Sequence, residues 1–256
     1  TGVGTMIERA LEWELFPSGR DVVYTAVDVA SENTAAIPDR LAAWATDRPV
    51  ETREREDEIA LVWPDRTVTI RPETAEAGAF VAAADRSWDL LVGMAVLDLI
   101  EGDRLSTLLS ALAPAGYWYF PITFDGGTRF TPAHPADDAV ERYYHQHMDT
   151  KPGGDSRAGQ HTLARLHATD RATVTAVAGS DWVVYPRDGG YPGDEAYFLR
   201  YVLDTIEGAL AEVDRGADLD ADVLADWLRT RREQVADGTL TYVTHQLDLL
   251  GQWDGV

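Results

Sequence analysis

Residues 1–28 read TGVGTMIERALEWELFPSGRDVVYTAVD, and this stretch decides the fold. A glycine turn at Gly2–Gly4 leads into apolar residues at helical spacing, and the β-rich run Val22–Val27 ends at Asp28. Glycines in such a turn let backbone N–H groups approach a ligand at the positive end of a helix. In open α/β sheets, an acidic residue at the end of the next strand, roughly 20–25 residues further on, accepts hydrogen bonds from ribose hydroxyls. The pattern therefore predicts an adenosine-containing cofactor at the carboxyl edge of a sheet.

Both features also have a purely structural interpretation. The glycines alone would serve a tight strand-to-helix turn. Asp28 alone would serve as a helix-start residue, because a helix is expected from Ser31. The combination of the two, in this order, is what points to a cofactor.

Beyond residue 28, short β-rich runs alternate with amphipathic helical runs, which predicts parallel strands covered by helices. Pro38 is expected to interrupt the helix that starts at Ser31. The charged run Glu51–Glu58 is expected to be a solvated edge or turn. The segment 128–159 mixes Pro and Gly with aromatic and His residues, which is typical of a functional loop-and-helix region. Further strands are expected at residues 67–70, 88–94, 117–124, 173–178, 182–185 and 240–249, and further helices at 105–112, 162–167, 194–210 and 220–237.

Composition excludes several classes of function. The 256 residues are 45% apolar and carry 44 acidic against 22 basic side chains, for a net charge of −22 with Lys151 as the one lysine. Acids spread along the whole chain are typical of a halophilic protein, in which molar salt screens the repulsion, although an ordinary acidic protein remains the alternative. The lack of a basic stripe disfavours nucleic acid as a partner. Without cysteines, disulfides and thiolate sites are excluded, and without an apolar run of about 18 residues a cytoplasmic, membrane-free location is expected.

The chain resembles the class I S-adenosylmethionine-dependent methyltransferases over nearly its full length. The stretches that carry the resemblance, in chain order, are TGVGT (1–5), VYTAVD (23–28), Glu76-Ala77, WDLLVGMAVLDL (88–99) and LAPAGYWYFPITFDG (112–126). The resemblance implies an α/β fold with a doubly wound, Rossmann-like mixed sheet of seven strands in a single domain over residues 1–256. The family's first strand is expected upstream of Thr1. Residues 189–238 are expected to form a helical insertion that caps the substrate pocket or makes a homodimer contact.

The resemblance also implies a cofactor site for S-adenosylmethionine. Asp28 is expected to bind the ribose, Glu76 the adenine amino group, and the Ala77 backbone N–H the adenine ring, although Glu76 alone would more often be a surface helix acid. The full set of expected cofactor-binding residues is Gly2, Val3, Gly4, Asp28, Val29, Glu76, Ala77, Gly93, Met94 and Asp98.

A small-molecule methyl acceptor is expected, with Phe124, Tyr144 and Trp182 as substrate-binding residues. An oxygen acceptor would profit from a base, and His147 is the expected catalytic residue. Positions i and i+2 of a helix face differently, so at most one of His145 and His147 points into a pocket, and both would otherwise be hydrated surface residues. The same spacing argues against a His-X-His metal site, and no metal is expected.

Two other functions share part of this pattern. An NAD(P)-dependent oxidoreductase has the same glycine turn and the same acid after the second strand, but does not require Glu76-Ala77 or the segment 112–126. A non-catalytic nucleotide-binding protein on the same fold would bind the cofactor without turnover.

Overall fold

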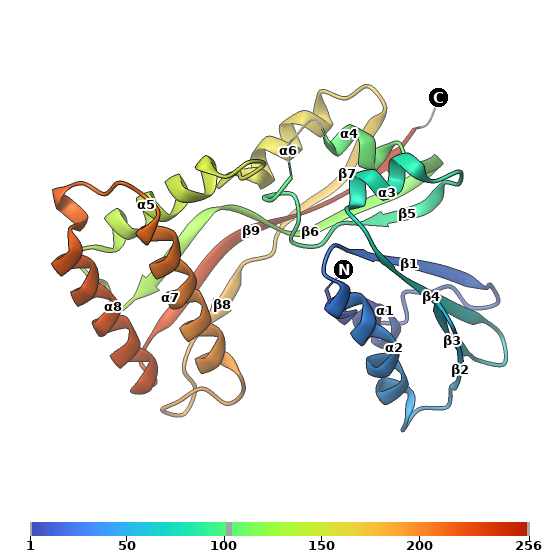
Figure 1. The fold of residues 1–256 in the computed structure, drawn as a ribbon, viewed down its shortest axis with the longest axis horizontal. Coiled ribbons are helices and arrows are strands. Elements are labelled where there is room, and N and C mark those ends of the chain that lie inside the picture. Colours follow the sequence, from blue (N-terminus) through green and yellow to red (C-terminus); the bar gives the residue numbers. More distant parts are fainter. Residues whose placement is uncertain (1, 101–103, 255–256) are drawn as a thin grey trace. The chain divides into compact units, whose positions relative to one another are not determined.

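The computed structural model describes residues 2–100 and 104–254. By its internal contacts the chain divides into two compact units, Thr1–Arg86 and Ser87–Val256. Figure 1 labels the helices and strands of each unit. The single domain expected over residues 1–256 and the cap role of its insertion stay predictions. In the described part of the chain, no helix combines the length and apolar character needed to cross a membrane.

The first unit is a four-stranded mixed sheet with helices. Its elements, in chain order, are α1 (Thr5–Glu12), β1 (Val22–Asp28), α2 (Ser31–Ala45), β2 (Glu51–Arg55), β3 (Glu58–Val62), β4 (Thr67–Thr74) and α3 (Ala77–Ala83). The strand order is β1-β4-β3-β2, with β1 parallel to β4 and the other pairs antiparallel. Its core packs Ile59, Leu61, Val68 and Ile70 of the sheet with Ile7, Leu11, Ile37 and Leu41 of α1 and α2.

The structure contradicts the prediction made for helix α2 and agrees with the prediction made for strand β2. The break expected at Pro38 is wrong, because α2 continues through it from Ser31 to Ala45. Ile37 and Leu41 lie buried on one face of α2, and this packing outweighs the one backbone hydrogen bond that proline removes. The charged run after residue 50 is indeed a solvated edge, since all five residues of β2 are exposed. The partner strand β3, whose sequence EIALV alternates in burial, was missed by the sequence analysis.

The second unit is a five-stranded mixed sheet with helices. Its elements are β5 (Trp88–Val92), α4 (Arg104–Leu109), β6 (Leu112–Thr131), α5 (Asp137–Thr150), α6 (Ala158–His167), β7 (Ala172–Gly179), β8 (Trp182–Val184), α7 (Glu195–Ala211), a 3-10 turn (Ala217–Leu219), α8 (Ala221–Ala236) and β9 (Thr241–Trp253). The order is β5-β6-β9-β7, and β8 also pairs with β9. Strands β5 and β6 are parallel, whereas β9 runs antiparallel to its neighbours.

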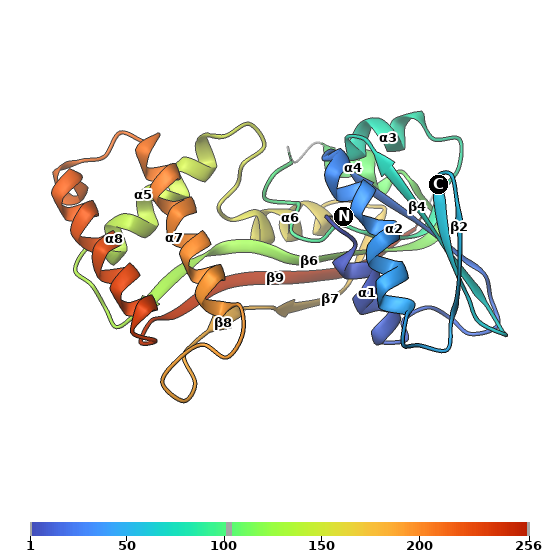
Figure 2. The ribbon, with the colours of Figure 1, turned by 60° about the horizontal axis from the view of Figure 1, so that its bottom comes forward.

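The long strand β9 buries opposite faces at its two ends. Tyr242 and Gln246 are buried toward one end, and Leu249 and Trp253 toward the other, so the buried positions change from even to odd numbers. Because successive side chains of a strand point to opposite faces, the two ends use different faces of the sheet. The even face packs with the core of α5, α7 and α8, and the odd face with that of α4 and α6. Figure 2 shows β6 and β9 side by side along this length.

The expected α/β class with mixed, partly antiparallel sheets is confirmed. The expected count of seven strands is not what the described residues show, since their nine strands form sheets of four and five. The segment 189–238 contains helices α7 and α8, as its periodicity predicts. The carboxylate of Asp220 caps α8 by accepting from the backbone N–H groups of Asp222 and Val223.

Candidate functional site

Asp28 lies at the carboxyl end of β1, beside the glycine turn of the first unit. Its carboxylate accepts hydrogen bonds from Gly2 N at 2.7 Å, Ala30 N at 3.0 Å and Asn33 Nδ2 at 3.2 Å. Gly2 and Gly4 have φ values of 55° and 89°, in the left-handed region that favours glycine. The turn expected at Gly2–Gly4 and the acid expected at the strand tip are thus in direct contact.

The hydrogen bonds decide the charge of Asp28. Partial burial opposes ionisation of its carboxyl group, but the bonds from Ala30, Gly2 and Asn33 outweigh it and hold the pKa well below the ordinary value. Val29, the next residue, exposes 70% of its surface although it is apolar. The strand tip therefore presents an ionised acceptor next to an exposed apolar side chain, and Val3 lies half-buried in the adjoining turn.

Glu76 lies at the same sheet edge as Asp28. Asp28 pairs with Thr74 across the parallel strands, and Ala75 N donates to Asp28 O at 2.9 Å. The Glu76 side chain is the N-cap of α3, where its two oxygens accept from Gly78 N at 3.1 Å and Ala79 N at 2.7 Å. The structural interpretation of Glu76 as a helix acid is thus confirmed, while its role toward adenine stays a prediction.

Gly93, Met94 and Asp98 follow strand β5 in the second unit. Gly93 packs so closely on Phe120 that an added Cβ would lie 2.9 Å from its ring. Asp98 is largely buried, and its Oδ1 atom has no hydrogen-bond partner among the described residues. Burial raises the pKa of the Asp98 carboxyl group, and the charge of Asp155 acts in the same direction. An unpartnered buried acid is costly, so Asp98 keeps its place as a candidate for contact with a ligand.

Two of the expected substrate-binding residues lie near His145. The ring of Phe124 packs edge-on against the His145 imidazole at a centroid distance of 5.4 Å. The Tyr144 ring is 6.1 Å from the same imidazole. Burial raises the pKa of the Tyr144 hydroxyl, and the charges of Asp98 and Tyr201 add to that shift. Phe124 and Tyr144 are therefore brought together in one aromatic cluster of the second unit.

Trp182 belongs to the same end of the sheet but is less enclosed. Its side chain is on β8 and packs edge-on against Phe198 of α7, with ring centroids 5.6 Å apart. Phe198 in turn contacts Tyr242. Trp182 stays 40% exposed, which leaves part of its ring available to a ligand.

His147 lies elsewhere on α5, where its imidazole contacts Glu212. Its Nε2 atom is 3.1 Å from Glu212 Oε2, and Lys151 Nζ is 2.5 Å from the same oxygen. These contacts join the end of α5 to the end of α7 and engage the imidazole in a hydrogen bond with Glu212. A catalytic role for His147 stays a prediction.

The residues that the sequence analysis missed are Asn33, Thr128, Thr244 and Gln246, whereas His145 was considered beside His147. Asn33 donates to the Asp28 carboxylate, whereas Thr128 of β6 and Thr244 and Gln246 of β9 are buried on one face of that strand pair. The alternation of Thr244 and Gln246 with apolar residues in β9 carried a signal of this group. No group of three or more His, Asp or Glu residues in the described ranges has a geometry suited to a metal ion.

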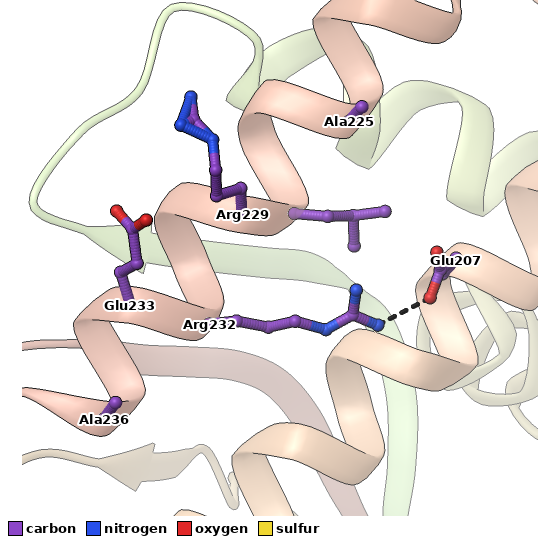
Figure 3. A pocket seen from close by; sticks show the side chains of 7 residues that line it. Glu207, Ala225, Arg229, Arg232, Glu233 and Ala236 are labelled. Carbon is purple, nitrogen blue, oxygen red and sulfur yellow. Dashed lines mark hydrogen bonds and ion pairs between the residues drawn. The ribbon is translucent and has the colours of Figure 1, made fainter.

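A separate surface hollow of about 550 Å³ lies between α7 and α8. Figure 3 shows Arg232 reaching across it to Glu207, and the guanidinium also pairs with Asp204. None of the expected site residues lines this hollow. Its charges already pair with one another, so we assign it no role in the site.

Comparison with models of protein families finds no match, and comparison with curated proteins finds none either. Several solved structures are similar. A putative methyltransferase from Bacillus halodurans is 10% identical over 97% of this chain and 99% of that chain, with a TM-score of 0.49. A putative sarcosine dimethylglycine methyltransferase from Galdieria sulphuraria is 11% identical over 98% and 87%, with a TM-score of 0.41. An S-adenosylmethionine-dependent methyltransferase from Geobacter sulfurreducens, in complex with S-adenosyl-L-homocysteine, is 12% identical over 98% and 90%, with a TM-score of 0.40.

Proposed function

We propose that the protein is an S-adenosylmethionine-dependent methyltransferase that acts on a small-molecule acceptor. The observation that carries the proposal is the ionised Asp28 carboxylate, bonded to the Gly2 N–H at the shared carboxyl edge of two parallel strands. A carboxylate at such an edge accepts the hydroxyl groups of a ribose. The glycine turn beside it leaves room for a nucleoside to approach the backbone.

The residues at this edge also fit an adenine ring. Among the described residues, the Ala77 N–H, at the start of α3, has no acceptor in the protein, and Ala77 is exposed. This donor suits a ring nitrogen of adenine, and the neighbouring Glu76 carboxylate suits its amino group. The exposed Val29 side chain offers an apolar contact for the nucleoside between the two acids.

Methyl transfer requires little covalent chemistry from the residues of the protein. Bound S-adenosylmethionine supplies an electrophilic methyl group on a sulfonium. The chain's own residues bind and orient the two substrates and exclude water, which accounts for much of the rate enhancement in such reactions. Asp28 fulfils the binding part of this task, because an ionised acceptor anchors the sugar.

An NAD(P)-dependent oxidoreductase is the second candidate, because it too would use the Gly2–Gly4 turn and Asp28. Glu76-Ala77 at the next strand tip favours the methyltransferase, since a dehydrogenase does not require this pair. Isothermal titration calorimetry of the full-length protein in molar KCl separates the two. We expect binding of S-adenosylhomocysteine and none of NAD, and tighter binding of NAD would reverse the order.

The net charge of −22 supports a further part of the proposal, a salt-loving source. Lys151 is the one lysine, so nearly all cationic partners of the acids are arginines. A cytoplasmic location, a homodimer and the lack of nucleic-acid and membrane partners stay predictions.

A further inference from the structure

Strand β7 forms an open edge of the second unit's sheet. It pairs with β9 on one side, and among the described residues no strand pairs with its other side. Strand β8 continues the same edge, because β7 and β8 pair with successive parts of β9 on the side away from β6 (Figure 2). The backbone N–H and C=O groups that point outward from this edge are able to pair with a further strand.

The β7–β8 edge lacks the charges that usually protect an edge strand. The two strand orders end at β1, β2, β5 and β7, and within the described ranges β7 (ATVTAVAG) is the one of these four without a charged residue. Strands β1 and β5 each contain an aspartate, and β2 (ETRER) is charged at four of its five positions. Charged side chains on an edge oppose pairing with other chains. Neither β7 nor β8 (WVV) has this protection.

Apolar side chains along this edge are exposed although they continue a buried core. Val177 of β7 lies directly opposite Leu249 of β9, which is fully buried, yet Val177 is 43% exposed. Val183 of β8 is 55% exposed, and Tyr185 beyond it is also exposed. All five residues 175–179 are exposed, so both faces of this part of β7 are open. A group of exposed apolar side chains of this kind indicates contact with another molecule.

The chain around this edge lacks the negative charge of the rest of the protein. The protein has 44 acidic and 22 basic side chains, but residues 156–180 contain three arginines and one aspartate. This range includes α6, which packs against β7. The acid between β7 and β8, Asp181, has its Oδ1 atom 2.7 Å from His245 Nδ1. Two copies of a chain with a net charge of −22 therefore meet less repulsion at this edge than at the acidic surfaces elsewhere.

We propose that two copies of this chain form a homodimer in which β7 of one protomer pairs antiparallel with β7 of its partner. A two-fold axis perpendicular to the sheet makes the paired strands antiparallel, and both protomers then use the same surface. The outward N–H and C=O groups of the two strands satisfy one another. The two sheets become one continuous sheet, and the apolar side chains of both edges are covered. The assembly closes at two copies, because the pairing uses the open edge of each protomer.

This surface differs from the homodimer contact expected of residues 189–238. Tyr197 of α7, in that range, is also exposed, but the backbone groups of a helix are already paired within it. An open strand edge offers a partner both backbone and side-chain contacts, which favours β7 over α7. The proposed dimer is independent of the proposed methyl transfer, because it uses no residue near Asp28.

The oligomeric state of charged variants gives the first test. Sedimentation velocity of the full-length protein in molar KCl is expected to show a dimer. Val177→Glu is expected to raise the dissociation constant about tenfold or more, because it brings like charges together across the paired edges. Tyr197→Glu is the matched control, since it makes the same charge change at an exposed side chain of α7, and it is expected to stay dimeric.

Three outcomes of this experiment would overturn the proposal. They are a monomeric natural protein, a dimer that Tyr197→Glu dissociates and Val177→Glu does not, and an assembly that keeps growing with protein concentration. A melting curve for each variant shows whether it folds.

Disulfide cross-linking gives the second test, which does not depend on disrupting the edge. The natural chain has no cysteine, so a disulfide formed by a single introduced cysteine must join two copies. Single substitutions to cysteine at each of the positions 173–179 scan β7. In the proposed pairing one position lies opposite its own copy, within the Cα separation of about 4.4–6.8 Å that a disulfide needs. Each step of one residue from it moves the two cysteines about 7 Å further apart along the strands.

We expect oxidation to give the highest yield of cross-linked dimer at one position of β7 and lower yields on both sides of it. Arg53→Cys, on the exposed edge strand β2, is the matched control and is expected to stay uncross-linked. Yields along β7 that are no higher than that of Arg53→Cys would overturn the proposal, because random collision would then explain them.

Discussion

Asp28 and Glu76 follow one another along one edge of the first unit's sheet, where Ala75 N donates to Asp28 O at 2.9 Å just beyond the last paired residues of β1 and β4. The two acids belong to neighbouring parallel strands, whose carboxyl ends meet at that edge. Each carboxylate accepts backbone N–H groups, Asp28 from the glycine turn and Glu76 from the start of α3.

The low pKa of Asp28 predicts a pH-dependent stability difference. A carboxyl group whose pKa is lower in the folded than in the unfolded state stabilises the fold above the unfolded value of about 4, and this contribution is lost as pH falls through the folded value. Asp28→Asn is therefore expected to be less stable than the natural protein at pH 7. Urea unfolding at several pH values would show the difference shrinking below about pH 4. A difference that stays constant with pH would contradict the assignment.

Truncation of the buried Arg231 side chain is expected to lower the free energy of unfolding strongly. Its side chain is fully buried on α8, donates to Pro132 O at 2.6 Å and pairs with Asp137, which also accepts from Trp227 Nε1. Removing one partner of a buried pair leaves an uncompensated charge, so Arg231→Ala is expected to lower the free energy of unfolding by about 3–5 kcal/mol. Arg229, whose pair with Asp226 is exposed, is the matched control. Arg229→Ala is expected to cost less than about 1 kcal/mol in urea unfolding, and equal losses for both variants would refute the prediction.

Substitution of His147 tests which of the two histidines on α5, His145 or His147, could act as a base. Because its imidazole is paired with Glu212, His147→Gln is expected to leave the pH profile of methyl transfer unchanged. The variant would instead loosen the contact between the ends of α5 and α7, with a small loss of stability. Steady-state kinetics over pH 6–9 would check this. Loss of the acid limb in His147→Gln, with His145→Gln unaffected, would instead support a catalytic role for His147.

The charge of the chain predicts a dependence on salt. With a net charge of −22, repulsion destabilises the compact state when it is not screened. The midpoint of thermal unfolding is expected to rise steadily as KCl increases from about 0.1 M, where the Debye length is about 10 Å, to molar concentrations. Indifference to salt over this range would remove the halophilic part of the proposal.

The sequence predicts the elements of this chain better than their ends. Strand β1, helix α1 and the helical pair α7–α8 follow from periodicity and are present. Strand β6 extends beyond the expected residues 117–124. The glycine-containing segments on either side of the expected strand form irregularities within β6 and do not end it. Ala115 and Gly126 have positive φ values of 64° and 81° within it. Pairing with the regular strand β9 sustains the ladder across these irregularities, and a local pattern does not reveal such pairing.

The candidate site is only partly readable from sequence for a similar reason. Asp28 is recognisable because its place after a strand is a local feature. The choice between His145 and His147 depends on how α5 is rotated on the sheet, which is fixed by tertiary packing. Glu141 and His145 are one turn apart and both contact Thr128, so that face of α5 lies on β6. Spacing alone states that one histidine faces inward, but not which one.

Asp28 is the proposed ribose-binding acid, and the proposed function requires it most directly. Calorimetric titration of S-adenosylhomocysteine into the natural protein, Asp28→Ala and Asp39→Ala tests it directly, since Asp39 is an exposed acid on α2 of the same unit. We expect Asp28→Ala to weaken binding at least tenfold while its circular dichroism spectrum stays that of a folded protein, and Asp39→Ala to bind as the natural protein does. Equal affinity in all three proteins would contradict the central claim.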